Sequence, residues 1–160
     1  MSHPSLGHPP PDPTAGFPAA AERIRLHRDR LAARAVGIAA DADPTLRDRY
    51  DQTGMRHLVR DAALLADRVA LCVATADPTL ATEYAEMTTL VYRRRQTPMD
   101  DLVAICEGLR QALPSVLAPG ELGLALEAID GASDAWHWHR RIAGDARRKN
   151  PILQFLYKGG

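Results

Sequence analysis

The sequence predicts an all-α domain, either a globin-like fold or an antiparallel bundle of about six helices. Three observations support this fold class. The pentapeptide Ala-Asp-Pro-Thr-Leu occurs at 42–46 and again at 76–80, each time between two amphipathic stretches. Apolar residues recur at helical spacing in every long segment, and no segment alternates in the manner of a strand. The segments are joined by brief linkers, as in helical bundles.

The repeated pentapeptide is expected to start a helix at each copy. Asp43 and Asp77 can accept hydrogen bonds from N–H groups of the new first turn. The proline that follows each of them suits the first helical position, where its missing N–H would have no partner. Thr97 and Pro98 are expected to open a later helix in the same way.

Six helices are expected in order, five long and one short, over 19–42, 44–53, 55–75, 78–95, 98–114 and about 119–147. The third is apolar on two sides, which predicts a central position. The fourth places Tyr84, Met87 and Val91 on one face together with Leu80. Around these helices, the domain organisation expected is a disordered proline-rich arm over 1–18, a helical domain over 19–148 and an apolar, basic tail over 149–160.

Composition excludes several classes of function. The 160 residues are 46% hydrophobic, enough for one domain with a core, and 20 basic residues balance 20 acidic ones. The zero net charge removes the general electrostatic case for binding nucleic acid or an anionic membrane. Cys72 and Cys106 lie in apolar stripes without metal-ligand spacing, so both are expected in the core. No export signal or membrane-spanning run is present, which favours the cytoplasm.

Two histidines are candidate ligands. His139 lies near the middle of the apolar part of the last helix, which also contains Trp136 and Trp138, so His139 is expected to be buried and His137 exposed. His27 shares a side with apolar residues of the first helix. A buried imidazole could bind a haem or another tetrapyrrole. The alternative is that both histidines are structural and hydrogen-bonded.

No catalytic or metal motif is found. His57 and Asp61 are one turn apart, a spacing that general acid–base chemistry could use, but a solvated contact on the helix surface is the interpretation we favour. Neither a serine elbow nor a glycine-rich phosphate loop is present. The sequence therefore predicts a protein that is not an enzyme and needs no cofactor.

The C-terminal segment is a candidate partner-binding site. Basic residues, including Arg147 and Arg148, precede an apolar run that contains Ile152, Leu153, Phe155, Leu156 and Tyr157. Exposed side chains of this size would forfeit about 1.5 to 3 kcal/mol each relative to full burial. The tail is therefore expected either to fold back on the domain or to dock on another protein.

The stretch from 43 to about 113 resembles the N-terminal sensory domain of RsbR-type stressosome proteins and their RsbRD-like relatives. The residues concerned are Asp43, Pro44, Leu46 and Tyr50, then Asp77, Pro78, Leu80 and Tyr84, then 97–102 and 108–110. The resemblance implies a globin-like, often dimeric domain without haem that senses or transmits a signal. Multidomain members continue into a STAS domain, whereas this sequence ends at Gly160, so a module acting through its own surfaces is expected.

Two hypotheses follow. The first is a non-enzymatic regulatory or sensory module that works through protein contacts, as a homodimer and with a partner docked by the tail. The second is a globin-like protein that binds a small molecule or tetrapyrrole through His139 or His27.

Overall fold

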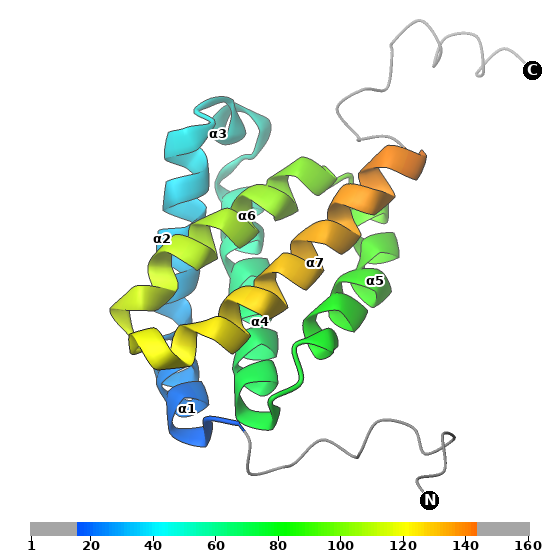
Figure 1. Ribbon diagram of the computed structural model, residues 1–160. Coiled ribbons are helices and arrows are strands. Elements are labelled where there is room, and N and C mark those ends of the chain that lie inside the picture. Colours follow the sequence, from blue (N-terminus) through cyan, green and yellow to red (C-terminus); the bar gives the residue numbers. More distant parts are fainter. Residues whose placement is uncertain (1–15, 144–160) are drawn as a thin grey trace, which may run out of the picture.

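The computed structural model describes residues 16–143, which form an all-helical domain (Figure 1). Its α-helices are α1 (Pro18–Leu26), α2 (Arg28–Ala42), α3 (Thr45–Arg49), α4 (Gln52–Thr75), α5 (Thr79–Arg94), α6 (Met99–Ala112) and α7 (Leu122–Ala143). Two 3-10 turns, η1 (Leu113–Ser115) and η2 (Pro119–Glu121), join α6 to α7. The all-α prediction is confirmed.

The first helix is divided, which the sequence analysis did not expect. His27 ends α1 and precedes α2, with φ −104° and ψ 12° in place of helical angles. Its N–H still donates to the carbonyl of Arg23 at 3.1 Å, so the chain changes direction without losing this hydrogen bond. α1 packs mainly on α4, whereas α2 packs on both α4 and α6, and the break at His27 allows the two directions.

The central position expected for the third helix is confirmed. α4 packs against α1, α2, α5 and α7 and is the longest helix of the described chain. Its buried side chains include Leu58, Leu65, Val69 and Val73. Many of the surrounding core residues are alanines, so the helices approach closely.

Both copies of the pentapeptide start helices by the same hydrogen bonds. Asp43 Oδ1 accepts from the backbone N–H of Thr45 at 3.2 Å, and Asp77 Oδ1 accepts from that of Thr79 at 3.1 Å. The hydroxyl of each threonine donates to the same carboxylate at 2.6 Å. The capping function expected for these aspartates is confirmed.

Other helix boundaries differ from the expected ones. Thr97 makes no capping bond and Pro98 is extended, with ψ 139°, so this pair does not repeat the aspartate–proline arrangement. Gly54, expected to separate two helices, lies in the first turn of α4, where its N–H donates to Asp51 Oδ1 at 2.7 Å. The short helix ends at Arg49 because the chain becomes extended at Tyr50.

α7 lies over α4 and between α5 and α6 (Figure 1). On the α6 side, Arg110 pairs with Asp130, and Arg140 pairs with Asp100 at 2.9 Å. On the α5 side, Arg93 donates to the carbonyl of His139 at 2.8 Å. Within residues 16–143 no helix is both long and apolar enough to span a membrane.

Candidate functional site

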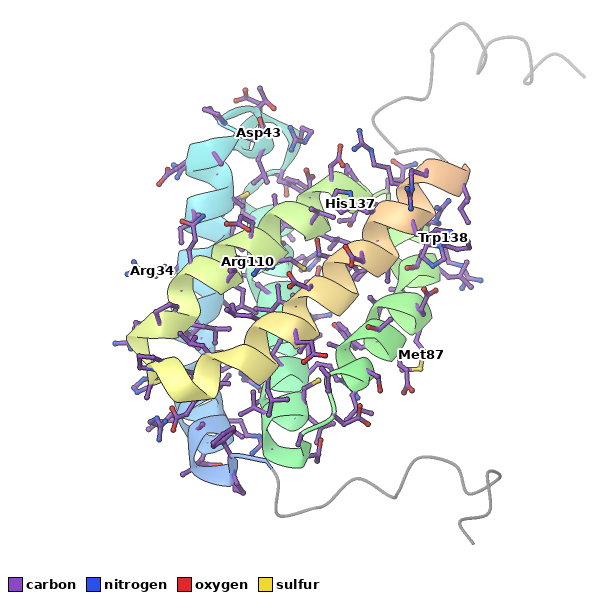
Figure 2. All side chains as sticks on the ribbon, in the orientation of Figure 1. Arg34, Asp43, Met87, Arg110, His137 and Trp138 are labelled. Atoms are coloured by element: carbon purple, nitrogen blue, oxygen red, sulfur yellow. The ribbon has the colours of Figure 1, made fainter. Side chains whose placement is uncertain are left out.

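Two neighbouring helices expose large apolar side chains on one side of the domain. Met87, Leu90 and Val91 of α5 are 67%, 65% and 50% exposed, and Trp138 and Ile142 of α7 are 47% and 59% exposed. Figure 2 shows Met87 and Trp138 projecting outward at this side. We call the surface formed by these five residues the α5–α7 face. An exposed apolar patch of this kind marks a contact site more often than an isolated exposed leucine does.

The spacing along α5 explains why these side chains point outward. Residues three or four apart share one side of a helix, so Met87, Leu90 and Val91 project together. The adjoining side of α5 is also apolar, and its residues Tyr84, Ala85 and Tyr92 are the ones buried against the core. Tyr84, Met87 and Val91 do lie within one sector of α5, three and four residues apart, but the core buries only Tyr84, at one edge of this sector, and leaves Met87 and Val91 exposed.

Charged residues border the apolar part of the face in a fixed order. On α5, Glu83 lies one turn before Met87 and Arg94 lies one turn after Leu90. On α7, Asp134 lies one turn before Trp138 and Arg141 follows it by three residues. All four are exposed, and none forms an ion pair with another residue of the described chain. α5 thus has apolar residues of the face between Glu83 and Arg94, and α7 has Trp138 between Asp134 and Arg141, with Ile142 directly after Arg141.

His139 lies where α7 contacts α5. Its Nε2 is 2.5 Å from Oε2 of Glu86, and its ring meets the edge of the Trp138 indole, with 4.9 Å between ring centroids. Its side chain is 17% exposed, so the expectation of a buried His139 is corrected to a partly buried one. Because Glu86 engages Nε2, His139 joins α5 to α7 and does not present that nitrogen to a ligand.

Of the other candidate ligand-binding residues, Trp138 contacts His139, whereas His27 lies on other helices and Trp136 is buried in the core. His27 is partly buried at the break between α1 and α2, and Figure 1 shows α1 at the end of the domain away from the C-terminal part of α7. Trp136 is 1% exposed and meets Tyr92 edge-on, with centroids 6.0 Å apart. Trp138 is exposed, contrary to its expected place in the apolar part of the helix, and His137 is exposed as expected.

A buried ion pair was missed by the sequence analysis. Asp61 is 4% exposed, and its two oxygens accept from Arg95 at 3.2 and 3.0 Å. The prediction of a solvated contact between His57 and Asp61 is therefore wrong. Burial raises the pKa of both nearby phenols, Tyr84 and Tyr92. The position of Asp61 inside the apolar stripe of α4 was the signal that could have indicated a buried partner.

A second buried carboxylate ties α6 to the chain that precedes α4. Asp101 is fully buried, and it accepts from Arg49 at 2.7 Å and from the Tyr50 hydroxyl at 2.6 Å. Arg49 also pairs with the helix-capping Asp43 at 3.1 Å. Each buried carboxylate is thus paired with an arginine, which offsets the cost of burying its charge.

Cys72 and Cys106 are buried, as expected. Burial raises the pKa of the Cys72 thiol to about 11 and also raises that of Cys106. In the part of the chain that the structure describes, no three metal-ligand side chains cluster. The tail residues Arg147, Arg148, Ile152, Leu153, Phe155, Leu156 and Tyr157 lie outside the described residues, as does the arm up to residue 15.

No protein-family model matches this chain, and no curated protein shows significant similarity to it. The likeness to RsbR-type sensory domains therefore stays an expectation from the sequence. Among these groups of residues, the α5–α7 face is the one we take as the candidate functional site. Contact with another molecule would remove its exposed apolar side chains from water, which is favourable.

Proposed function

We propose that this domain is a non-enzymatic regulatory or sensory module that acts through protein contacts, and that the α5–α7 face is its main contact surface. The single observation behind the proposal is the exposure of Met87, Leu90, Val91, Trp138 and Ile142 on two adjacent helices. Removing such side chains from water contributes about 25 cal/mol per Å² of apolar surface, part of which offsets the entropic cost of association.

The composition of the face supports a protein partner. Interfaces are enriched in tryptophan and methionine at their centres and have polar, charged rims. The face has Trp138 and Met87 near its middle, and Glu83, Arg94, Asp134 and Arg141 around them. The resemblance to a sensory domain agrees with a module of this kind, in a cytoplasmic setting, with the segment 152–157 as a second contact.

The geometry at His139 gives the tetrapyrrole alternative less support. A haem ligand needs an imidazole nitrogen directed into an apolar pocket. Nε2 of His139 is instead 2.5 Å from a carboxylate oxygen of Glu86, and the His139 side chain is partly exposed. His27 lies at the break between α1 and α2, and α7 packs mainly on α5, α6 and α4, so nothing in the described domain brings the two histidines to one iron.

Site-specific photocrosslinking in the source cells tests the proposal. A photoreactive amino acid replaces Met87 on the face, and in a matched variant it replaces Leu26, which is 74% exposed on α1. We expect a discrete crosslinked protein product from position 87 and none from position 26. The product should disappear when Leu90→Glu is added. No product from position 87, or the same products from both positions, would contradict a contact function for the face.

A further inference from the structure

We propose that the molecule seated on the α5–α7 face is a second copy of this chain, with the two α5 helices antiparallel across a twofold axis. This inference rests on the proposed contact function of the face and names its partner. In a twofold dimer the same patch is used by both copies, so the patch must complement itself. The order of charges on the face has that property.

The order along α5 fixes a register. Antiparallel pairing sets Glu83 opposite Arg94 of the partner subunit when the axis passes between Thr88 and Thr89. The same axis sets Met87 opposite Leu90 of the partner subunit, because the midpoint of Met87 and Leu90 also lies between Thr88 and Thr89. Opposite charges then meet at both ends, and apolar side chains meet in the middle.

α7 gives the same axis independently. The midpoint of Asp134 and Arg141 lies between His137 and Trp138. α5 and α7 run side by side in the same direction (Figure 1). Gly131 of α7 lies beside Thr82 of α5, because a Cβ built on Gly131 would lie 2.3 Å from Thr82 Oγ1. The midpoint of Glu83 and Arg94 lies as many residues after Thr82 as the midpoint of Asp134 and Arg141 lies after Gly131. One axis therefore pairs Asp134 with Arg141 of the partner subunit as well.

A parallel arrangement of the two copies is disfavoured by the same charges. It would place Glu83 against Glu83 of the partner subunit and Arg94 against Arg94 of the partner subunit. Like charges across an interface are costly, and complementary charges fix both partner choice and register. The exposed state of the four charges, with no ion pair inside the described domain, leaves them available for these contacts.

Charge reversal tests the register in the full-length protein. We expect Glu83→Arg alone and Arg94→Glu alone to weaken self-association about tenfold each, because each change turns two attractive contacts of the dimer into repulsive ones. An equimolar mixture of the two variants should recover wild-type association, because in the mixed dimer both contacts join opposite charges again. Sedimentation velocity over a concentration series measures each dissociation constant, and circular dichroism verifies that each variant is folded.

The matched control uses Arg34, an exposed residue of α2 remote from the face (Figure 2). Arg34→Glu changes the net charge as Arg94→Glu does and should leave self-association unchanged. In a mixture of Glu83→Arg with Arg34→Glu, the second variant should associate with itself as wild type does, but the mixed dimer should stay weak because one of its two contacts still joins like charges, although the net charges are the same as in the rescuing mixture. Recovery in this control would show that overall charge, not register, drives the effect and would overturn the proposal.

Two further outcomes separate this inference from the proposed function. If the wild-type protein is monomeric throughout the series while position 87 still crosslinks to a different protein, the second copy is overturned and the contact function stands. If the full-length protein is monomeric and deletion of residues 150–160 makes it dimerise, the second copy as the occupant of the face in the full-length protein is likewise overturned. If position 87 crosslinks to nothing, both proposals fail.

Discussion

The guanidinium of Arg95 lies 3.0 Å from one carboxylate oxygen of Asp61 and 3.2 Å from the other, at a point where the carboxylate is almost completely buried. The pair joins the middle of α4 to the residue that directly follows α5. Hydrogen bonding to Asp61 raises the pKa of Arg95, which favours the charged guanidinium.

Removing the cation should destabilise the domain strongly. We expect Arg95→Met to lower the free energy of unfolding by about 3 kcal/mol, because Asp61 would remain buried without a counter-charge. Arg25→Met is the control, since its partner Glu22 is exposed and 3.7 Å away, and it should cost less than about 0.5 kcal/mol. Urea denaturation measures both. Equal losses in the two variants would show that burial of Asp61 does not matter.

The two identical pentapeptides should differ in their contribution to stability. Asp77→Ala should cost about 1 kcal/mol, the usual value of a helix cap. Asp43→Ala should cost more, because Asp43 also pairs with Arg49, which in turn binds the buried Asp101. Asp41→Ala, at an exposed position, serves as the control. Thermal unfolding of the three variants compares them, and a smaller loss for Asp43→Ala than for Asp77→Ala would contradict the role of Arg49.

Two glycines should respond in opposite directions to alanine. A Cβ on Gly108 would lie 2.2 Å from the carbonyl oxygen of Ala35, so Gly108→Ala must push α6 away from α2 and should cost about 2 kcal/mol. A Cβ on Gly37 meets no atom within 4 Å, so Gly37→Ala should stabilise α2 by about 0.5 to 1 kcal/mol. Chemical denaturation measures both. A stabilised Gly108→Ala variant would contradict the close approach of these helices.

Acid should destabilise the domain partly through Glu121. Its pKa is lowered from the usual 4.5, first by its hydrogen bond with Arg23 and then by the N–H of Ala118. A carboxyl with a lower pKa in the folded state stabilises the fold above its unfolded pKa, and this stabilisation is lost as the pH falls through the folded value. Melting temperatures between pH 7 and acid should therefore fall less steeply in Glu121→Gln than in wild type. Identical slopes would contradict the pairing.

The native thiols should be inert in the folded protein. Cys72 and Cys106 are buried, and the pKa of Cys72 is raised to about 11, so little thiolate exists near neutral pH. We expect no reaction with a thiol reagent in native buffer and two equivalents of reaction in denaturant. Arg34→Cys, at an exposed position, should add one fast equivalent in native buffer. Rapid labelling of wild type would contradict the burial of both thiols.

Local chemistry made part of this structure predictable from the sequence. Asp43 and Asp77 cap helices through bonds that span only two residues, so their function depends on the neighbouring backbone alone. Helical periodicity depends on the sequence in the same local way, and it predicted the all-α class and the central α4. The break at His27 was missed because it depends on how α1 and α2 pack against other helices.

The candidate site could not be predicted in the same way. Periodicity shows which residues share a side of a helix, but α5 has apolar residues on two sides, and only its packing against α4 and α7 determined that Tyr84 and Tyr92 are buried while Met87 and Leu90 are exposed. The partners of Asp61 and Asp101 likewise come from 34 and about fifty residues away. The sequence by itself determined where helices begin and which residues can enter a core. The tertiary structure alone decided which faces meet, because that choice depends on the summed packing of distant segments.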